Sequence, residues 1–278
     1  MQMLKSVAAT IMMALLFAGP SGCSKKEPLK IKIAGSTTIL PFMVRISEHY
    51  SGKGEVEIQV NSCGSLKGVE ALLNGTCDVA MCSSPIPPDM IANAASKGMQ
   101  IKGFPFAHDL IVPIVHPSNP VDSLSLDQLA NIYQGTIDSW AGLGGNPGKI
   151  DVVARAPSSG TREVWNQVIL KSAKGREGRV IQDSNSGVLA YVAEHPQAIG
   201  YVSLVIVNHE VKVLSVGGVR PSIDTARDRK YPVSRKLYLY VDEKTLSYPV
   251  KSLIVFFLSD QGQQIVTRSG FIPQDALK

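Results

Sequence analysis

Three short runs rich in Ser, Thr and Gly stand immediately before segments with helical spacing, at residues 35–38, 63–65 and 158–161. Arg155 precedes the third run. The first turn of a helix presents backbone N–H groups without acceptors inside the helix, together with a partial positive charge, so anions bind there. Ser and Thr hydroxyls add donors, and Arg155 adds a full charge. If the three runs converge, they predict a pocket for a small oxyanion.

Each run also has a structural interpretation. Ser and Thr are common helix N-caps, and Ser159 would then cap a helix that begins near Thr161. Arg155 would pair with a carboxylate such as Asp151 or Glu163. Convergence of all three runs distinguishes an anion pocket from three separate caps.

Strand and helix patterns alternate along the chain. Strand patterns cover residues 29–34, 56–60, 78–82, 110–115, 152–154, 199–202 and 237–240. Helical spacing covers residues 39–50, 65–74, 85–97, 126–133, 162–171, 187–195, 250–258 and 261–269. Strands separated by helices of about ten residues predict βαβ units, and hence an α/β fold with mainly parallel sheets.

The N-terminus has the pattern of an export signal. Lys5 is followed by an apolar stretch at residues 7–18, which is too short to span a membrane, and then by Gly19-Pro20-Ser21-Gly22-Cys23. Small residues leading into Cys23 resemble a bacterial lipobox, although Pro20 stands where an aliphatic residue is usual. We therefore predict a lipoprotein signal peptide over residues 1–22, lipidation of Cys23 and a short tether over residues 23–29. Plain secretion and an uncleaved anchor are the alternatives.

Composition limits the partners of the mature chain. Removal of residues 1–22 leaves 256 residues, enough for two lobes, and lowers the formal charge from +5 to about +4. No run of Lys or Arg exceeds Lys25-Lys26, and aromatic residues are few. We therefore expect no nucleic-acid partner. Lipidation would place the protein in the cell envelope, facing the periplasm or the exterior.

Three cysteines remain after Cys23, namely Cys63, Cys77 and Cys82. An odd number in an exported chain permits at most one disulfide. Their spacing, without paired histidines, does not predict a zinc site. We expect neither a metal nor a cofactor.

Enzymatic motifs are missing from the sequence. It contains no G-x-S-x-G, S-x-x-K, H-E-x-x-H or G-x-x-x-x-G-K-[ST] pattern, and its five histidines are scattered. A hydrolase with Ser159 as nucleophile would need a base within hydrogen-bond reach, and the sequence offers none. We therefore expect a protein that is not an enzyme and keep a Ser159 phosphoester hydrolase as the alternative.

The order of the motifs resembles the PstS-type phosphate-binding proteins of bacterial ABC importers, over nearly all of the mature chain. The matching segments are AGSTTILP (34–41), CGSLKGV (63–69), NGTCDVA (74–80) with residues 83–85, IYQGTIDSW (132–140), Arg155 with residues 159–161, HPQAIGYV (195–202) and residues 257–273. The resemblance implies a type II periplasmic-binding-protein fold with two lobes, parallel-rich sheets and two hinge crossings, near residues 110–117 and 200–207. Lobe one would comprise residues 30–116 and 204–278, and lobe two residues 117–203. Such proteins close about a hinge around the ligand.

The resemblance also implies the residues that bind inorganic phosphate. These are Ser36, Thr37, Thr38, Ser65, Ser83, Arg155, Ser159, Gly160 and Thr161. Ser83 stands where some members carry an Asp that accepts a hydrogen bond from protonated phosphate, so selectivity among oxyanions stays open. The implied partner is an ABC permease, served by a monomer tethered to the membrane. A sensor or binding protein for another oxyanion is the second alternative.

Overall fold

The computed structural model describes residues 28–51, 56–171, 173–175 and 179–277. The predicted signal peptide and Cys23 lie outside these residues. No helix within the described ranges has the length and apolar character needed to cross a membrane. Cys63, Cys77 and Cys82 are free thiols.

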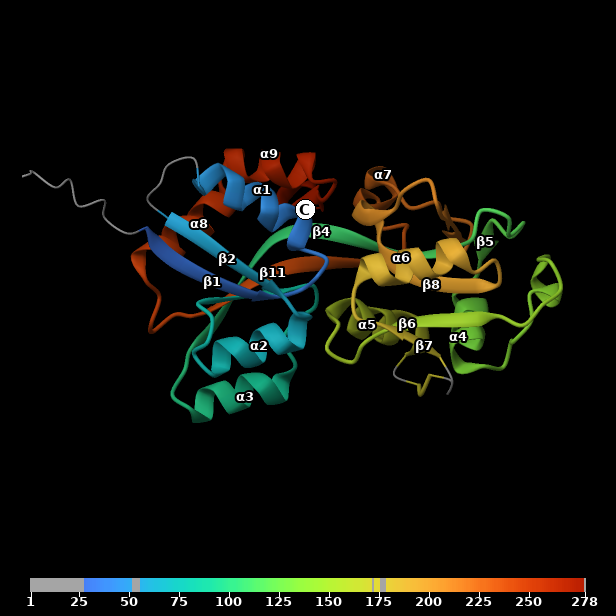
Figure 1. Ribbon diagram of the computed structural model, residues 1–278, viewed down its shortest axis with the longest axis horizontal. Coiled ribbons are helices and arrows are strands. Elements are labelled where there is room, and N and C mark those ends of the chain that lie inside the picture. The colour runs from blue at the N-terminus through green and yellow to red at the C-terminus, as the bar shows by residue number, and fades with distance from the viewer. Residues whose placement is uncertain (1–27, 52–55, 172, 176–178, 278) are drawn as a thin grey trace, which may run out of the picture.

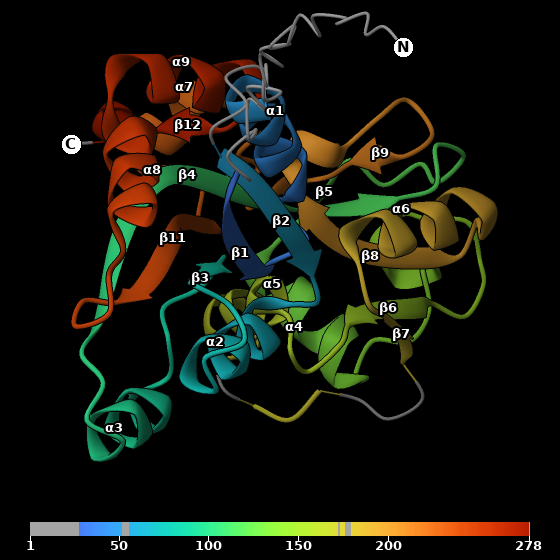
Figure 2. The same cartoon turned by 60° about the vertical axis from the view of Figure 1, so that its left-hand side comes forward.

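The first core surrounds three parallel strands in the order β2 (Val56–Ser62), β1 (Leu29–Gly35) and β3 (Val79–Cys82). Successive side chains of a strand point to opposite faces, and the last residues of β1, Ile33 to Gly35, are buried on both. Ile31 and Ile33 pack with Phe42 of α1 (Leu40–Ser51), whereas Ala34 packs with Val69 of α2 (Ser65–Leu73). Figure 2 shows α1 on one side of β1 and β2, and α2 on the other.

Three further helices complete this half of the molecule: α3 (Pro88–Ser96), α8 (Tyr248–Leu258) and α9 (Asp260–Arg268). Phe257 of α8 packs edge-on against Phe42 and Phe106, with ring centroids 5.0 and 5.4 Å away. The last part of the chain is thereby joined to its beginning.

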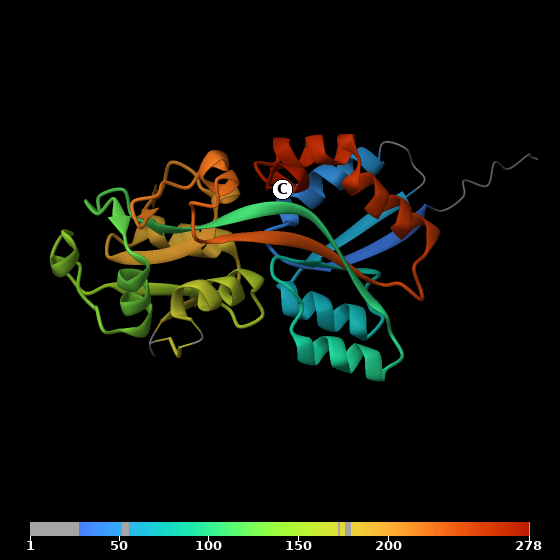
Figure 3. The ribbon, with the colours of Figure 1, turned by 180° about the vertical axis from the view of Figure 1, so that it is seen from behind.

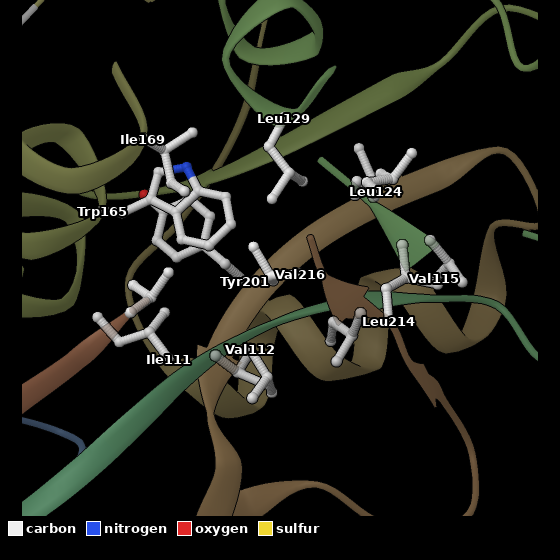
Figure 4. Close-up of a cluster of buried hydrophobic side chains, with 14 of the residues drawn as sticks. Ile111, Val112, Val115, Leu124, Leu129, Trp165, Ile169, Tyr201, Leu214 and Val216 are labelled. Atoms are coloured by element: carbon white, nitrogen blue, oxygen red, sulfur yellow. The ribbon is translucent and has the colours of Figure 1, made fainter. Parts of the chain in front are cut away.

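The second core surrounds the parallel strands β8 (Ala198–Ser203), β6 (Asp151–Arg155) and β7 (Val180–Gln182). Its helices are α4 (Leu126–Gln134), α5 (Gly160–Trp165) and α6 (Asn185–Glu194). Trp165 and Tyr201 stack at a centroid distance of 4.4 Å (Figure 4). Tyr133 packs against both rings. The shorter helical segments are η1 (Ala141–Leu143), the π-helix η2 (Asn166–Leu170), η3 (Leu204–Ile206) and η4 (Gln274–Leu277).

Two long strands join the cores (Figures 1 and 3). In β4 (Ile101–Val115), residues 101–110 pair antiparallel with β11 (Ser234–Asp242), and residues 111–115 pair antiparallel with β8. β11 also pairs with β3. The predicted α/β fold, with parallel strands grouped in two halves and two crossings, is confirmed.

The position of the second crossing differs from the expectation. We expected it near residues 200–207, but β8 pairs with β4 and β6 inside the second core, and the chain leaves that core only at β11. Leu214 and Val216 lie in the second core (Figure 4). Residues 204–233, which the expected boundary gave to lobe one, therefore belong to the second half.

The segment from 204 to 233 is held there by short pairings. β9 (Lys212–Val213) pairs with β4, and β10 (Ser215–Val216) pairs with β5 (Ser123–Leu124); α7 (Ile223–Arg227) follows. We use lobe one for residues 28–109 and 235–271, and lobe two for residues 110–234. β12 (Ile272–Pro273) pairs with β4 at the junction.

Candidate anion-binding site

The three hydroxyl-rich runs lie together where the two lobes meet (Figure 1). The run at 35–38 follows β1, that at 63–65 follows β2, and that at 158–161 follows β6. The carboxyl ends of parallel strands share one edge of a sheet, so the turns that follow them gather there. Each lobe presents this edge to the other.

Ser83, just after β3, is the centre of a hydroxyl cluster in lobe one. Ser36 Oγ donates to Ser83 Oγ (3.0 Å), and Ser65 Oγ lies 3.3 Å from Ser83 Oγ. Ser65 Oγ accepts from the backbone N–H of Ser83, and Ser36 Oγ accepts from that of Thr38, both at 3.2 Å. All four residues are buried. The turns after β1, β2 and β3 thus form one polar surface.

The start of α5 presses against this surface from lobe two. Thr161 Oγ1 lies 3.3 Å from Thr38 Oγ1, and the backbone N–H of Leu66 donates to the carbonyl oxygen of Ser158 (3.1 Å). Asn185 Nδ2, at the start of α6, donates to Thr38 Oγ1 (2.8 Å). The lobes are therefore closed on each other through the predicted residues.

This approach requires glycine at Gly160. A Cβ placed there would lie 2.5 Å from Ser65 Oγ and 2.8 Å from the Oγ atoms of Ser83 and Ser84, closer than real Cβ contacts. Any larger residue at 160 would push the start of α5 away from lobe one. The structure thus brings all nine predicted residues to one place.

Ser159 is also the helix cap that the structural interpretation expected. It is the N-cap of α5, and its Oγ accepts from the backbone N–H of Arg162 (3.3 Å). A hydroxyl that accepts one bond still has a proton to donate. The cap and a ligand contact are therefore compatible, and the first N–H groups of α5 are further donors without a partner inside the helix.

Arg155 ends β6 and is only 1% exposed. Nη1 donates to Asn185 Oδ1 (2.7 Å), and Nε donates to the carbonyl oxygen of Gln182 (3.3 Å). Nη2 donates to the carbonyl oxygen of Asp183 (2.9 Å) and, across the lobes, to Thr37 Oγ1 (3.0 Å). These contacts use four of the five N–H donors. The remaining one, on Nη1, has no acceptor among the described residues.

No carboxylate among the described residues forms an ion pair with Arg155, although the exposed Asp183 attracts its charge. Neither Asp151 nor Glu163 pairs with it, so the predicted alternative of a structural ion pair is wrong. Burial lowers the pKa of Arg155 to about 10, which still leaves it charged at neutral pH. A desolvated cation without a counter-ion is costly, and an anion bound beside it removes that cost.

Sequence reasoning missed a second buried arginine. Arg235 of β11 forms an ion pair with Asp109 of β4, with 2.6 Å between Nη2 and Oδ2. Arg235 also donates to Thr161 Oγ1 (2.8 Å) and Thr38 Oγ1 (3.2 Å), and Asp109 Oδ1 accepts from Ser203 Oγ (2.7 Å). The sequence did contain a signal for the burial of Arg235. Every second residue of β11 from Arg235 to Leu239 is buried, so Arg235 lies on the same buried face as Leu237 and Leu239.

The charges at the site add up to a positive centre. Among the buried side chains of the site, Arg155 and Arg235 are cations and Asp109 is an anion, so one buried positive charge remains beside a dense set of hydroxyl and N–H donors. Among the residues that the structure describes, no group of three or more His, Cys, Asp or Glu side chains is arranged for a metal ion. This chemistry suits a small oxyanion.

Comparison with known proteins gives the family. The profile of the PBP superfamily domain matches residues 22–261. The phosphate-binding protein PstS of Borreliella burgdorferi is 26% identical over 263 residues, which span 90% of this chain and 92% of that protein.

Two solved structures share the fold along almost their whole length. A putative phosphate ABC transporter substrate-binding protein from Clostridium perfringens, with bound phosphate, is 32% identical with a TM-score of 0.83, covering 88% of this chain and 99% of that one. An ABC-type phosphate transport receptor from Vibrio cholerae is 28% identical with a TM-score of 0.73, covering 88% and 99%. The type II periplasmic-binding-protein fold is thereby confirmed. This chain belongs to the PBP superfamily and, within it, to the PstS-type phosphate-binding proteins.

Proposed function

We propose that the chain binds inorganic phosphate between its two lobes and delivers it to the permease of an ABC importer. The observation that carries this proposal is Arg155, a buried cation placed where three hydroxyl-rich turns meet, with neither an ion-pair partner nor an acceptor for its fifth donor among the described residues. The names of the relatives from Borreliella, Clostridium and Vibrio support the same ligand and transport role.

The nine predicted residues would share the work. Thr37 and Thr38 would donate from the turn after β1, while Ser36, whose Oγ donates to Ser83 Oγ, would line the floor in lobe one with Ser65 and Ser83. From lobe two, Arg155 would supply the charge, and residues 159–161 would supply hydroxyl and backbone donors. Because the ligand would touch both lobes, its binding would stabilise the closed arrangement about β4 and β11.

Calorimetry on the purified chain, freed of bound anions, tests this function. Phosphate is expected to bind with measurable heat and at 1:1 stoichiometry, and arsenate should compete because it has the same shape and charge. Sulfate and molybdate complete the series. Tight binding of another oxyanion, with no heat from phosphate, would favour the alternative of a sensor or carrier for that anion.

We propose that the chain is not an enzyme. Ser159 Oγ accepts from Arg162, and no described histidine forms a hydrogen bond with Ser159, so a nucleophile and base are not paired. The relatives are named as binding proteins and receptors. Phosphatase activity that is lost in Ser159→Ala would instead establish the hydrolase alternative.

We further propose a monomer held at the cell envelope by a lipid on Cys23. The support is the pattern of residues 1–23 in the sequence. Replacing Cys23 by serine is expected to release the protein from the membrane fraction, because no acyl chain can then be attached. Fractionation followed by mass spectrometry of the N-terminal peptide checks this. A wild-type N-terminus without acyl chains would favour plain secretion.

A further inference from the structure

Arg235 uses all its guanidinium donors on protein atoms. Nε and Nη2 donate to Asp109 Oδ2 at 3.0 and 2.6 Å. Nη2 also donates to Thr38 Oγ1 (3.2 Å), while Nη1 donates to Thr161 Oγ1 (2.8 Å) and to the carbonyl oxygen of Ser83 (3.2 Å). Five contacts account for five N–H donors. Arg235 therefore has no donor for a bound anion and acts on it through the hydroxyls that it contacts.

The Thr38 hydroxyl can serve a ligand only as a donor. Asn185 Oδ1 accepts from Arg155, which fixes the amide so that Nδ2 donates to Thr38 Oγ1 at 2.8 Å. Arg235 donates to the same oxygen. Two N–H donors occupy both lone pairs of a hydroxyl oxygen, so Thr38 has only its proton to offer.

Thr161 is constrained less strictly, because only one fixed donor bonds to its oxygen. Its oxygen accepts from Arg235, and the only nearby hydroxyl with which it forms a hydrogen bond is Thr38, at 3.3 Å. If Thr38 donates to Thr161, both lone pairs of Thr161 are occupied and its own proton is free. If Thr38 does not, the proton of Thr38 is free instead, and Thr161 keeps one open lone pair. In either case at least one proton has no described protein acceptor and is available to an anion.

A carboxylate acceptor for a protonated ligand is missing from this arrangement. Asp109 is the carboxylate bonded into it, and its two oxygens are taken by Arg235 and Ser203. Ser83, which follows β3, already accepts from Ser36. The site therefore recognises charge through donors and offers a ligand O–H only hydroxyl oxygens, those of the serines and of Thr37 and Thr161, as acceptors.

We infer that Arg235 is a positioning residue that fixes Thr38 as a donor and occupies one lone pair of Thr161, so that the site takes tetrahedral oxyanions without requiring a proton on them. This inference rests on the proposed function and deepens it by assigning the selectivity of the same site. Sulfate, which carries no proton at neutral pH, then competes with phosphate. A site built to bond a ligand O–H rejects an analogue that lacks it by about ten-thousandfold or more, whereas other sites separate such isosteres by about a hundredfold.

Competition calorimetry on the wild-type chain is the first test. The dissociation constant of sulfate is expected to lie within about a hundredfold of that of phosphate. A larger ratio would overturn the inference and leave phosphate binding intact. Absence of heat with both anions would overturn the proposed function and the inference with it.

The double variant Asp109→Asn/Arg235→Met tests the role of Arg235 itself. It leaves the net charge unchanged and frees one lone pair each on Thr38 and Thr161. These lone pairs can then accept from the O–H of phosphate, whereas sulfate has no proton to donate. The ratio of the sulfate to the phosphate dissociation constant is expected to rise about tenfold or more, the effect of one hydrogen bond. A merely structural role would change both constants by the same factor.

Two further variants keep the test decisive. Asp122→Asn/Lys212→Met neutralises an exposed ion pair in lobe two and is expected to leave both constants unchanged. Thr161→Val removes one donor without changing the volume and is expected to weaken both anions by equal factors. Weakening of phosphate alone would show that Thr161 accepts the phosphate proton, and the inference would be wrong.

Discussion

Replacing Arg155 by alanine is expected to weaken phosphate binding by about 2–5 kcal/mol, which corresponds to roughly thirtyfold to several thousandfold in Kd. Arg155 is held in place within lobe two by Asn185 and two backbone carbonyls, so little ordering cost is left for the binding step. No carboxylate among the described residues forms an ion pair with it. Calorimetric titration with phosphate at neutral pH measures the loss.

Two variants separate the charge of Arg155 from its shape. Arg155→Lys keeps the charge but loses the planar fork that suits two phosphate oxygens, so its affinity is expected to fall between those of wild type and Arg155→Ala. Arg227→Ala removes the same charge from an exposed pair with Asp224 and is expected to bind as wild type. Equal affinities in Arg155→Ala and Arg227→Ala would place Arg155 outside the site.

The lobe-one turns and the α5 turn were predictable because each directly follows a strand. Once residues 29–34, 56–60 and 152–154 are recognised as strands, parallel pairing places the residues after them at a shared edge. Arg155 was found because it stands beside such a turn. Most residues of the candidate site could therefore be predicted from their position just after a strand. That they bind a ligand remains a prediction.

Arg235 and Asp109 could not be paired from the sequence because they lie 126 residues apart on strands of irregular pattern. The first part of β4 contains Gly103 and Pro105, which argue against a strand. The register between β4 and β11 shifts at Leu237 and Tyr238, so that Tyr238 faces Pro105 and Leu237 faces Ala107. This bulge accommodates the proline.

The assignment of residues 204–233 failed for a related reason. β9 and β10 are two residues long, too short to show a periodic pattern. Their partners, β4 and β5, lie about a hundred residues earlier in the chain, so only the folded arrangement selects the lobe. The consequence is functional, because it moves the second crossing to the strand that carries Arg235.

The Asp109–Arg235 pair joins the two crossing strands at the point where the lobes meet, and Asp109→Ala is expected to lower the free energy of unfolding by about 3–5 kcal/mol. Both side chains are almost fully buried, at 0% and 2% exposed, so the truncation leaves the guanidinium without a counter-ion. Urea denaturation in phosphate-free buffer measures this cost, since a bound anion would stabilise the native state of either protein.

A double variant tests whether the loss of stability in Asp109→Ala comes from the buried charge of Arg235. If the cost comes from the isolated cation, Asp109→Ala/Arg235→Met should recover most of it, because two apolar side chains leave no buried charge. Asp122→Ala is the matched control: it breaks the Lys212 pair, in which Asp122 is 86% exposed, and exposed pairs contribute about 0–1 kcal/mol. A cost for Asp109→Ala no larger than that of Asp122→Ala would mean that water reaches Arg235. Water could then also bond to the hydroxyls of Thr38 and Thr161. Arg235 would no longer fix the direction of their hydrogen bonds, and its effect on the ratio of the sulfate to the phosphate dissociation constant would be smaller.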